Sequence, residues 1–335
     1  MSTWSKSQII FILSLPAFIF FTVFSEAQEL SGKDTIRIAE AYQIADKVQE
    51  YVWPGWKAAP FTTLLVTSEY EYLIRAASKP DGFAELGWNK DLHSKVYFRN
   101  RTFDPKLLAT FPAFGESPVI VIGSAENTGK NSTAWVLTLL HEHFHQLQMS
   151  DPDYYRQVEA LGLAGDDKTG MWMLNYAFPY DSPEINKICS SLSLRLTPLL
   201  LGSINASEAD AFWREYATLE KSLNSRDFKY LSFQLWQEGI ARFIELRAAE
   251  AADKIVKPSA QFSKLADFES FSEAAKKLRV TMLSELQSAA LKEQKRVAFY
   301  PLGAAIGLLL DQTNPQWKRR YFKEKFALEK YAAGM

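Results

Sequence analysis

The pattern of apolar and polar positions divides the chain into two parts of different character. Up to about residue 125, short apolar stretches rich in β-branched and aromatic residues are separated by polar segments. An amphipathic stretch over residues 34–53 predicts a first helix, which Pro54 and Gly55 end. The short apolar stretches predict three strands, over residues 61–67, 95–103 and 117–123. The first part is therefore a small α/β unit with a mixed sheet.

Beyond Gly123 the pattern becomes helical almost throughout. Long amphipathic or apolar stretches predict helices over residues 132–148, 207–223, 230–255, 268–294 and 300–312. No internal repeat or low-complexity linker separates the two parts. The sequence thus predicts an α+β fold, in which a small mixed β-sheet unit precedes a larger, mostly helical part. We place an N-terminal α/β subdomain at residues 28–125 and a helical subdomain at 126–335, with a cleft between them.

The first residues carry an export signal by their pattern. Lys6 precedes a 16-residue apolar run at residues 9–24, and small residues stand on either side of Glu26, at Ser25 and Ala27. This predicts a signal peptide over residues 1–27, with cleavage before Gln28 and export to the periplasm or the outside. The alternative is an uncleaved membrane anchor, but the run is shorter than the roughly 20 residues of a span and contains a proline. No later run has membrane-spanning length.

Composition and charge narrow the class of protein. Of 335 residues, 47% are hydrophobic and 23% are charged, which is the composition of a folded globular protein. The net charge is −1 without a dominant basic block, so nucleic acid is not an expected partner. The single cysteine, Cys189, cannot form an internal disulfide, so the hydrophobic core must supply the stability. Neither charge nor pattern indicates an oligomeric state.

The segment after the third predicted strand superficially resembles a phosphate-binding loop. That motif requires four residues between its glycines, followed by Lys and then Ser or Thr. Here five residues separate Gly123 from Gly129, and Lys130 is followed by asparagine. We therefore reject a nucleotide site and predict that the next helix is capped by Asn131, Ser132 or Thr133.

Three of the four histidines lie in this predicted helix, within a span of five residues in the stretch TLLHEHFHQLQ at 138–148. Residues four apart on a helix are separated by about 40°, so His141 and His145 share one face and can offer two nitrogens to one metal ion. Glu142 lies about 100° from His141, where it can reach a water molecule held at that metal. His143 points about 200° away and is not expected to be a ligand of the same ion.

An ordinary explanation is that polar residues gather where the helix reaches solvent. Against it, a largely apolar stretch immediately precedes His141, so the histidines project from a buried segment. Buried imidazoles require partners, and Zn²⁺ supplies one. The helical context is what a His-Glu-x-x-His pattern needs to support a zinc site.

This segment resembles the active-site helix of the zincin metallopeptidases. Gln146 and the residues after it do not match the Gly and His extension of the metzincins. The stretch LWQEGIARFIELR instead resembles the second helix of the gluzincins, with Glu238 followed by small residues that would let two helices pack closely. The resemblance implies that His141, His145 and Glu238 bind zinc and that Glu142 is the base. The overall pattern also resembles uncharacterised secreted proteins classed as zinc-dependent proteases.

Three residues near the predicted site each have a second possible role. Glu245, seven residues after Glu238 on the same helix face, would serve either as the third ligand or as a group that orients a histidine. Glu238 would otherwise pair with Arg242, four residues on. Tyr300 is a candidate for stabilising the oxyanion of the reaction, with an ordinary core tyrosine as its alternative.

The function predicted from these residues is that of an exported zinc-dependent metallohydrolase, in the first place a peptidase acting on peptide or protein substrates. Peptides bound to zincins commonly add a strand to a sheet edge, and residues 117–123 would form that strand or its neighbour. The alternatives are a zinc-binding but catalytically inactive exported binding protein, and a non-peptidase zinc hydrolase. Glu142 disfavours the inactive protein, since a purely structural zinc site does not use a water-activating carboxylate.

Overall fold

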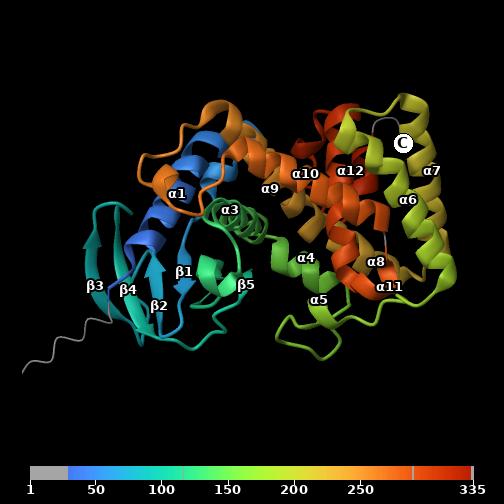
Figure 1. The fold of residues 1–335 in the computed structure, drawn as a ribbon. Coiled ribbons are helices and arrows are strands. Elements are labelled where there is room, and N and C mark those ends of the chain that lie inside the picture. Colours follow the sequence, from blue (N-terminus) through green and yellow to red (C-terminus); the bar gives the residue numbers. More distant parts are fainter. Residues whose placement is uncertain (1–28, 116, 289, 333–335) are drawn as a thin grey trace, which may run out of the picture.

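The computed structural model describes residues 29–115, 117–288 and 290–332. A six-stranded mixed sheet is followed by a mostly helical part, which confirms the predicted α+β fold class (Figure 1). The predicted signal peptide, residues 1–27, lies outside the described residues. Among the helices of the described ranges, none has the length and apolar character needed to cross a membrane.

The sheet has the strand order β3-β4-β2-β1-β6-β5. Only β1 and β6 run parallel, and the other neighbours are antiparallel. The three predicted strands correspond to β1, β4 and β6, whereas β2, β3 and β5 were not predicted. The bounds are Thr63–Val66 (β1), Tyr70–Ile74 (β2), Ala84–Asn89 (β3), Ser94–Asn100 (β4), Leu108–Phe111 (β5) and Val119–Gly123 (β6).

Both faces of the sheet centre are buried. In β1, Leu65 faces the main core beneath the helices, whereas Leu64 and Val66 face a smaller cluster that contains Phe83 and Val121. Side chains alternate between the faces of a strand, so a strand covered on both sides has no polar positions to alternate with. This explains why β1 and β6 are continuously apolar in sequence.

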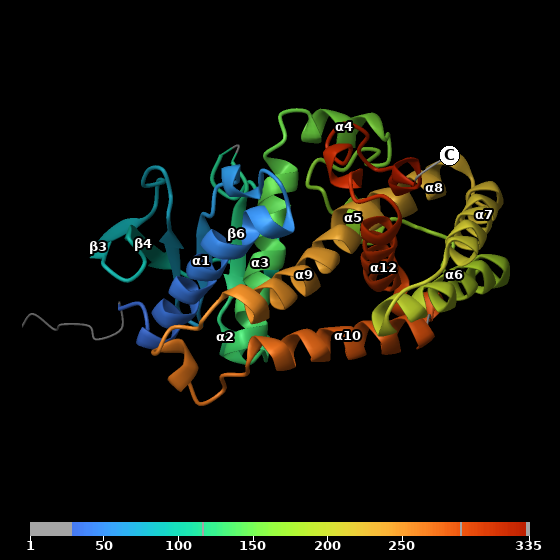
Figure 2. The same cartoon turned by 90° about the horizontal axis from the view of Figure 1, so that it is seen from above.

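All five predicted helical segments are confirmed, together with the first helix. The bounds are Gly32–Val52 (α1), Ala125–Thr128 (α2), Ser132–Met149 (α3), Tyr154–Ala160 (α4), Trp172–Asn175 (α5), Pro183–Leu201 (α6), Ala206–Ser222 (α7), Ser225–Gln234 (α8), Ile240–Ile255 (α9), Phe271–Ser288 (α10), Leu291–Gln294 (α11) and Phe299–Thr313 (α12). Helix α3 lies between the sheet and α9, and α1 packs beside both helices (Figure 2). One core cluster extends from Ile38 to Ala332 and so includes both parts of the chain.

Helices α8 and α9 are joined by a π-helical turn, η3, at Leu235–Gly239. Here α12 comes unusually close: a Cβ atom on Gly239 would lie 2.5 Å from the Cα of Gly303. No side chain fits between the two backbones. The small residue beside Glu238 therefore does permit close helix packing, but its partner is α12 rather than the histidine-bearing α3.

Candidate metal centre

Helix α3 brings its histidines to the boundary between the sheet and the helical part. Asn131 caps the helix, because its side-chain oxygen accepts a hydrogen bond from the Ala134 N–H at 2.8 Å. Helix α3 contacts β5 and β6 on one side and α9 on the other. The last turns of α3 therefore face both the sheet edge and the turn η3.

His141, His145 and Glu238 converge and could hold a metal ion. One ligand atom from each lies within 4.8 Å of the others. The two histidine Nε2 atoms are 3.1 Å apart, and Glu238 Oε2 is 3.5 Å from His145 Nε2 and 3.9 Å from His141 Nε2. Two ligands come from adjacent turns of α3 and the third from the π-helical turn, a local irregularity that is frequent at functional sites.

These distances fit a small divalent ion. Tetrahedral zinc with ligand bonds of about 2.0–2.1 Å places its ligand atoms about 3.3 Å from one another. The His–His and His145–Glu238 separations lie within a few tenths of an ångström of that value, and a small rotation of the Glu238 carboxylate would close the third. Two imidazoles and one carboxylate also form the donor set of a site that leaves a position open.

Gln148 fixes the orientation of His145. Its amide nitrogen donates to the backbone carbonyls of Trp236 and Gln237 at 3.1 and 3.0 Å and to the Tyr321 hydroxyl oxygen at 2.7 Å. Its Oε1 is thereby turned towards His145 Nδ1, at 2.6 Å. Gln237 Nε2 also lies 3.1 Å from this nitrogen, but the closer Gln148 oxygen favours a proton on Nδ1, which leaves Nε2 for a metal.

Glu245 lies behind His141 rather than among the converging ligand atoms. Its Oε2 is 3.9 Å from His141 Nδ1, and this nitrogen has no hydrogen-bond partner among the described residues. The carboxylate also accepts a hydrogen bond from Arg242 Nη1 at 2.6 Å. Arg242 therefore pairs with Glu245 and not with Glu238, and Glu245 faces the outer nitrogen of His141 without a hydrogen bond to it.

Without a metal, the charges of the cluster balance one another. Burial opposes the ionisation of Glu238, but the adjacent His145 charge outweighs it and lowers the pKa of Glu238 to about 2. Burial likewise opposes the protonation of His145, yet the Glu238 carboxylate raises the pKa of His145 to about 9. Burial and the nearby His145 lower the pKa of His141 to about 4. The metal-free protein thus contains a His145–Glu238 ion pair, in which the imidazole is buried and the carboxylate is partly exposed, and an ion would replace this pair.

Glu142 is held beside this cluster by the sheet edge. The Thr110 hydroxyl of β5 lies 2.8 Å from Glu142 Oε2 and 3.0 Å from the Glu142 backbone carbonyl. The carboxylate is buried, and burial raises its pKa. A buried carboxylate that is fixed by one hydrogen bond and has a raised pKa suits a group that accepts a proton during a reaction.

Tyr300 lies near Glu238 at the start of α12. Burial raises the pKa of the Tyr300 phenol, and the Glu238 carboxylate raises it further. Arg296 Nη1 donates a hydrogen bond to the Tyr300 hydroxyl. The close contact of Gly239 with Gly303 explains the position of Tyr300, which precedes that contact by one helical turn. Tyr300 therefore lies beside the cluster as a protonated hydrogen-bond donor.

His143 lies on the opposite side of α3, as predicted. Its ring stacks on Phe61 with centroids 3.8 Å apart, and its Nδ1 is 3.0 Å from Gln146 Oε1. Burial lowers the pKa of His143 to about 3. His93, the fourth histidine, is exposed in a loop far along the sequence from the cluster.

Several residues around the site were not predicted from the sequence. Gln148 stands three residues after His145, a helical spacing that could have identified it. Thr110 and Arg296 are remote in sequence from the motif and carry no local signal. Tyr154 is a further case: its hydroxyl donates to Gln237 Oε1 at 3.0 Å, beside Glu238.

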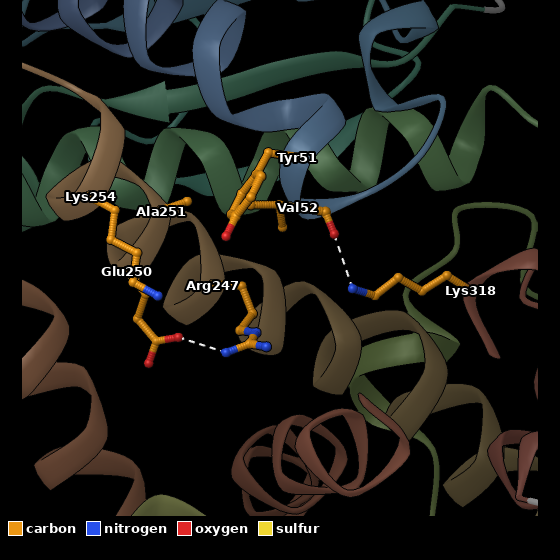
Figure 3. Close-up of a pocket in the computed structure, with 7 residues that line it drawn as sticks. All are labelled: Tyr51, Val52, Arg247, Glu250, Ala251, Lys254 and Lys318. Carbon is orange, nitrogen blue, oxygen red and sulfur yellow. Dashed lines mark hydrogen bonds and ion pairs between the residues drawn. The ribbon is translucent and has the colours of Figure 1, made fainter. Parts of the chain in front are cut away.

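A separate cavity is lined by residues from the end of α1 and from α9, together with Lys318 (Figure 3). Its volume is about 150 Å³. Arg247 on its wall pairs with Glu250 at 2.8 Å, and Lys318 donates to the Val52 carbonyl at 3.1 Å. Its lining includes none of the residues that could hold the metal.

Comparison of the chain with protein-family models, with curated proteins and with solved structures finds no match.

Proposed function

We propose that the protein is an exported zinc-dependent metallohydrolase that cleaves peptide bonds, with a site of the gluzincin type. The observation that carries this proposal is the convergence of His141, His145 and Glu238 with Glu142 fixed on the same helix. The donor set and its separations favour zinc among common divalent ions. Bound zinc would polarise the substrate carbonyl and lower the pKa of a water molecule to about 7.

The residues of the chain divide the remaining work. Glu142, oriented by Thr110, accepts a proton from the attacking water and returns it to the leaving amine. Tyr300 donates a hydrogen bond to the oxygen on which negative charge develops. Gln148 holds His145 in the orientation that the metal requires, and Glu245 supplies a negative charge 3.9 Å from the outer nitrogen of His141.

The free edge of β5 supports a peptide as the substrate. Gly123 N–H donates to the Leu107 carbonyl at 2.7 Å, so residues 107, 109 and 111 form the bonds with β6. The backbone groups of Leu108 and Thr110 then point towards the open edge, where an extended peptide can pair with them. The strand that would pair with the substrate is thus β5, which carries Thr110 and lies next to β6, the strand predicted at residues 117–123.

The test compares the purified protein with Glu142→Gln and with Glu220→Gln, an exposed glutamate of α7. Hydrolysis of a mixed peptide library should fall by more than about 100-fold in Glu142→Gln and stay unchanged in Glu220→Gln. Zinc content, measured by mass spectrometry of metals, should be equal in all three proteins.

Each other result contradicts a part of the proposal. Hydrolysis that survives in Glu142→Gln would contradict the role of Glu142. A zinc-loaded protein that cleaves esters or other amides but no peptide would be a non-peptidase hydrolase. One that binds peptides without any turnover would be an inactive binding protein. N-terminal sequencing of the protein isolated from the producing cells tests export, with Gln28 expected as the first residue.

A further inference from the structure

Arg296 is a half-buried cation beside the candidate metal site that lacks a carboxylate partner among the described residues. Its guanidinium donates to the Tyr300 hydroxyl and lies 5.6 Å from the centre of that ring. Arg242, the other arginine near the site, is neutralised by Glu245 at 2.6 Å. Arginine is usually paired when it is removed from water, so an unpaired guanidinium at this place requires an explanation.

The fold places Arg296 close to Glu238 and Tyr300. The contact between Gly239 and Gly303 draws the first turn of α12 against the π-helical turn that carries Glu238. Arg296 precedes Tyr300 by one turn, and its charge contributes to lowering the pKa of Glu238. Around it stand tyrosines, Tyr180 and Tyr230 besides Tyr300, whose pKa values respond to its charge.

Metal binding would leave this charge uncompensated. Glu238 is the carboxylate whose charge acts on Arg296, and the charge of a bound divalent ion would more than offset that of the carboxylate. The tyrosine hydroxyls are neutral, since their pKa values are raised by burial. The loaded site would therefore present a guanidinium with free N–H groups, held in place by one hydrogen bond to Tyr300.

We propose that Arg296 binds a carboxylate of the substrate and so selects peptides with a negative charge close to the cleaved bond. This inference rests on the proposed function. The planar fork of a guanidinium matches a carboxylate with two parallel hydrogen bonds, which gives direction as well as attraction. The carboxylate belongs either to the free C-terminus of a short peptide or to an Asp or Glu side chain.

Binding to the zinc-loaded Glu142→Gln protein separates these sources without turnover. The probes are one short peptide with a free C-terminus, the same peptide with a C-terminal amide, and the amide with a glutamate placed next to the cleaved bond. Adding Arg296→Gln should weaken binding of the charged peptides by about 10- to 100-fold and leave the uncharged amide unchanged. Arg296→Lys should give an intermediate loss, and Arg214→Gln, which removes an exposed arginine of α7, no loss.

Other outcomes overturn the inference. An equal loss for charged and uncharged peptides would show that Arg296 acts only by positioning Tyr300. Unchanged binding in Arg296→Gln, with normal zinc content and melting temperature, would exclude it from substrate recognition. If the wild-type protein, which retains Glu142, bound carboxylate-bearing peptides without cleaving them, the proposed function would be contradicted but the role of Arg296 would stand. If the wild-type protein cleaved charged and uncharged peptides equally well, the proposed function would stand and the role of Arg296 would be contradicted.

Discussion

The two faces of α3 hold chemically identical side chains in different surroundings. His141, His143 and His145 are all buried, with 9%, 1% and 5% of their surface exposed. His143 lies against Phe61 and Trp56 at centroid distances of 3.8 and 5.4 Å, whereas His145 faces His141 and Glu238. Two residues of separation reverse the face of the helix, and with it the groups that the imidazole meets. The groups that surround an imidazole, rather than its burial, decide whether it packs or binds.

The two faces differ even though His143 and His145 make the same local contact, with a glutamine three residues further along the helix. His143 Nδ1 contacts Gln146 Oε1 at 3.0 Å, and His145 Nδ1 contacts Gln148 Oε1 at 2.6 Å, each glutamine three residues on. Both rings are therefore fixed through Nδ1. The difference lies in what each ring meets: the His143 ring stacks on aromatic rings, whereas His145 Nε2 lies 3.1 Å from His141 Nε2 and 3.5 Å from Glu238 Oε2.

The largest expected effect is the loss of the metal in His145→Ala. Removing one of three ligands should lower zinc affinity by more than the roughly 10- to 100-fold that an outer partner contributes, and hydrolysis should disappear with it. Glu238 then becomes solvated at its partly open position, so the fold should persist. Metal mass spectrometry and circular dichroism measure both effects. A full complement of zinc in this variant would remove the contrast between the two faces.

His143→Ala should have the opposite profile. It deletes a ring from an aromatic stack in the core and leaves Gln146 Oε1 without its partner, so the free energy of unfolding should fall by about 2–4 kcal/mol. The folded fraction should keep its zinc. Urea denaturation of the metal-free protein measures the change, and His143→Phe, which restores the stack, should recover part of it. Zinc loss comparable to that of His145→Ala would break the comparison.

Glu245→Gln sharpens the distinction between a ligand and a group that orients a ligand. Because its carboxylate faces His141 Nδ1 and not the converging atoms, zinc affinity should fall by about 10- to 100-fold without being abolished. Competition with a chromogenic chelator gives the affinity. Glu285→Gln is the matched control, since Glu285 is also near Arg242, at 3.9 Å, but does not face a histidine. A complete loss of zinc would make Glu245 the third ligand.

Zinc binding should release about one proton per ion at pH 7. The pKa of His145 is raised to about 9 in the metal-free protein, so the ring is protonated there and must lose this proton to become a ligand. The pKa of His141 is lowered to about 4, so that ring contributes none. Affinity should rise by about tenfold per pH unit up to about pH 9 and then level off. Calorimetry in two buffers of different ionisation enthalpy measures the release, and a heat independent of buffer would contradict it.

The sequence predicted those features of the fold and the site that depend on residues close together in the chain. Helical spacing brought His141 and His145 to one face and turned His143 away, and the long periodic stretches gave most of the helical part, although α6 was not predicted. It was insufficient where partners are remote. Strand β5 is four residues long and half-buried, so it has little periodic signal, yet it supplies Thr110 to Glu142. The π-helical turn and the Gly239–Gly303 contact, which bring Glu238 and Tyr300 together, arise from helix packing that no local pattern encodes.

The most direct test of a metal site at this face of α3 is the zinc content of the purified wild type beside Glu238→Ala and Glu245→Ala. We expect about one zinc per chain in the wild type, none in Glu238→Ala and a detectable fraction in Glu245→Ala. Zinc that is retained in Glu238→Ala would contradict the assignment of the third ligand. A folded wild type that takes up no zinc, even after reloading, would contradict the metal site and the proposed hydrolase together.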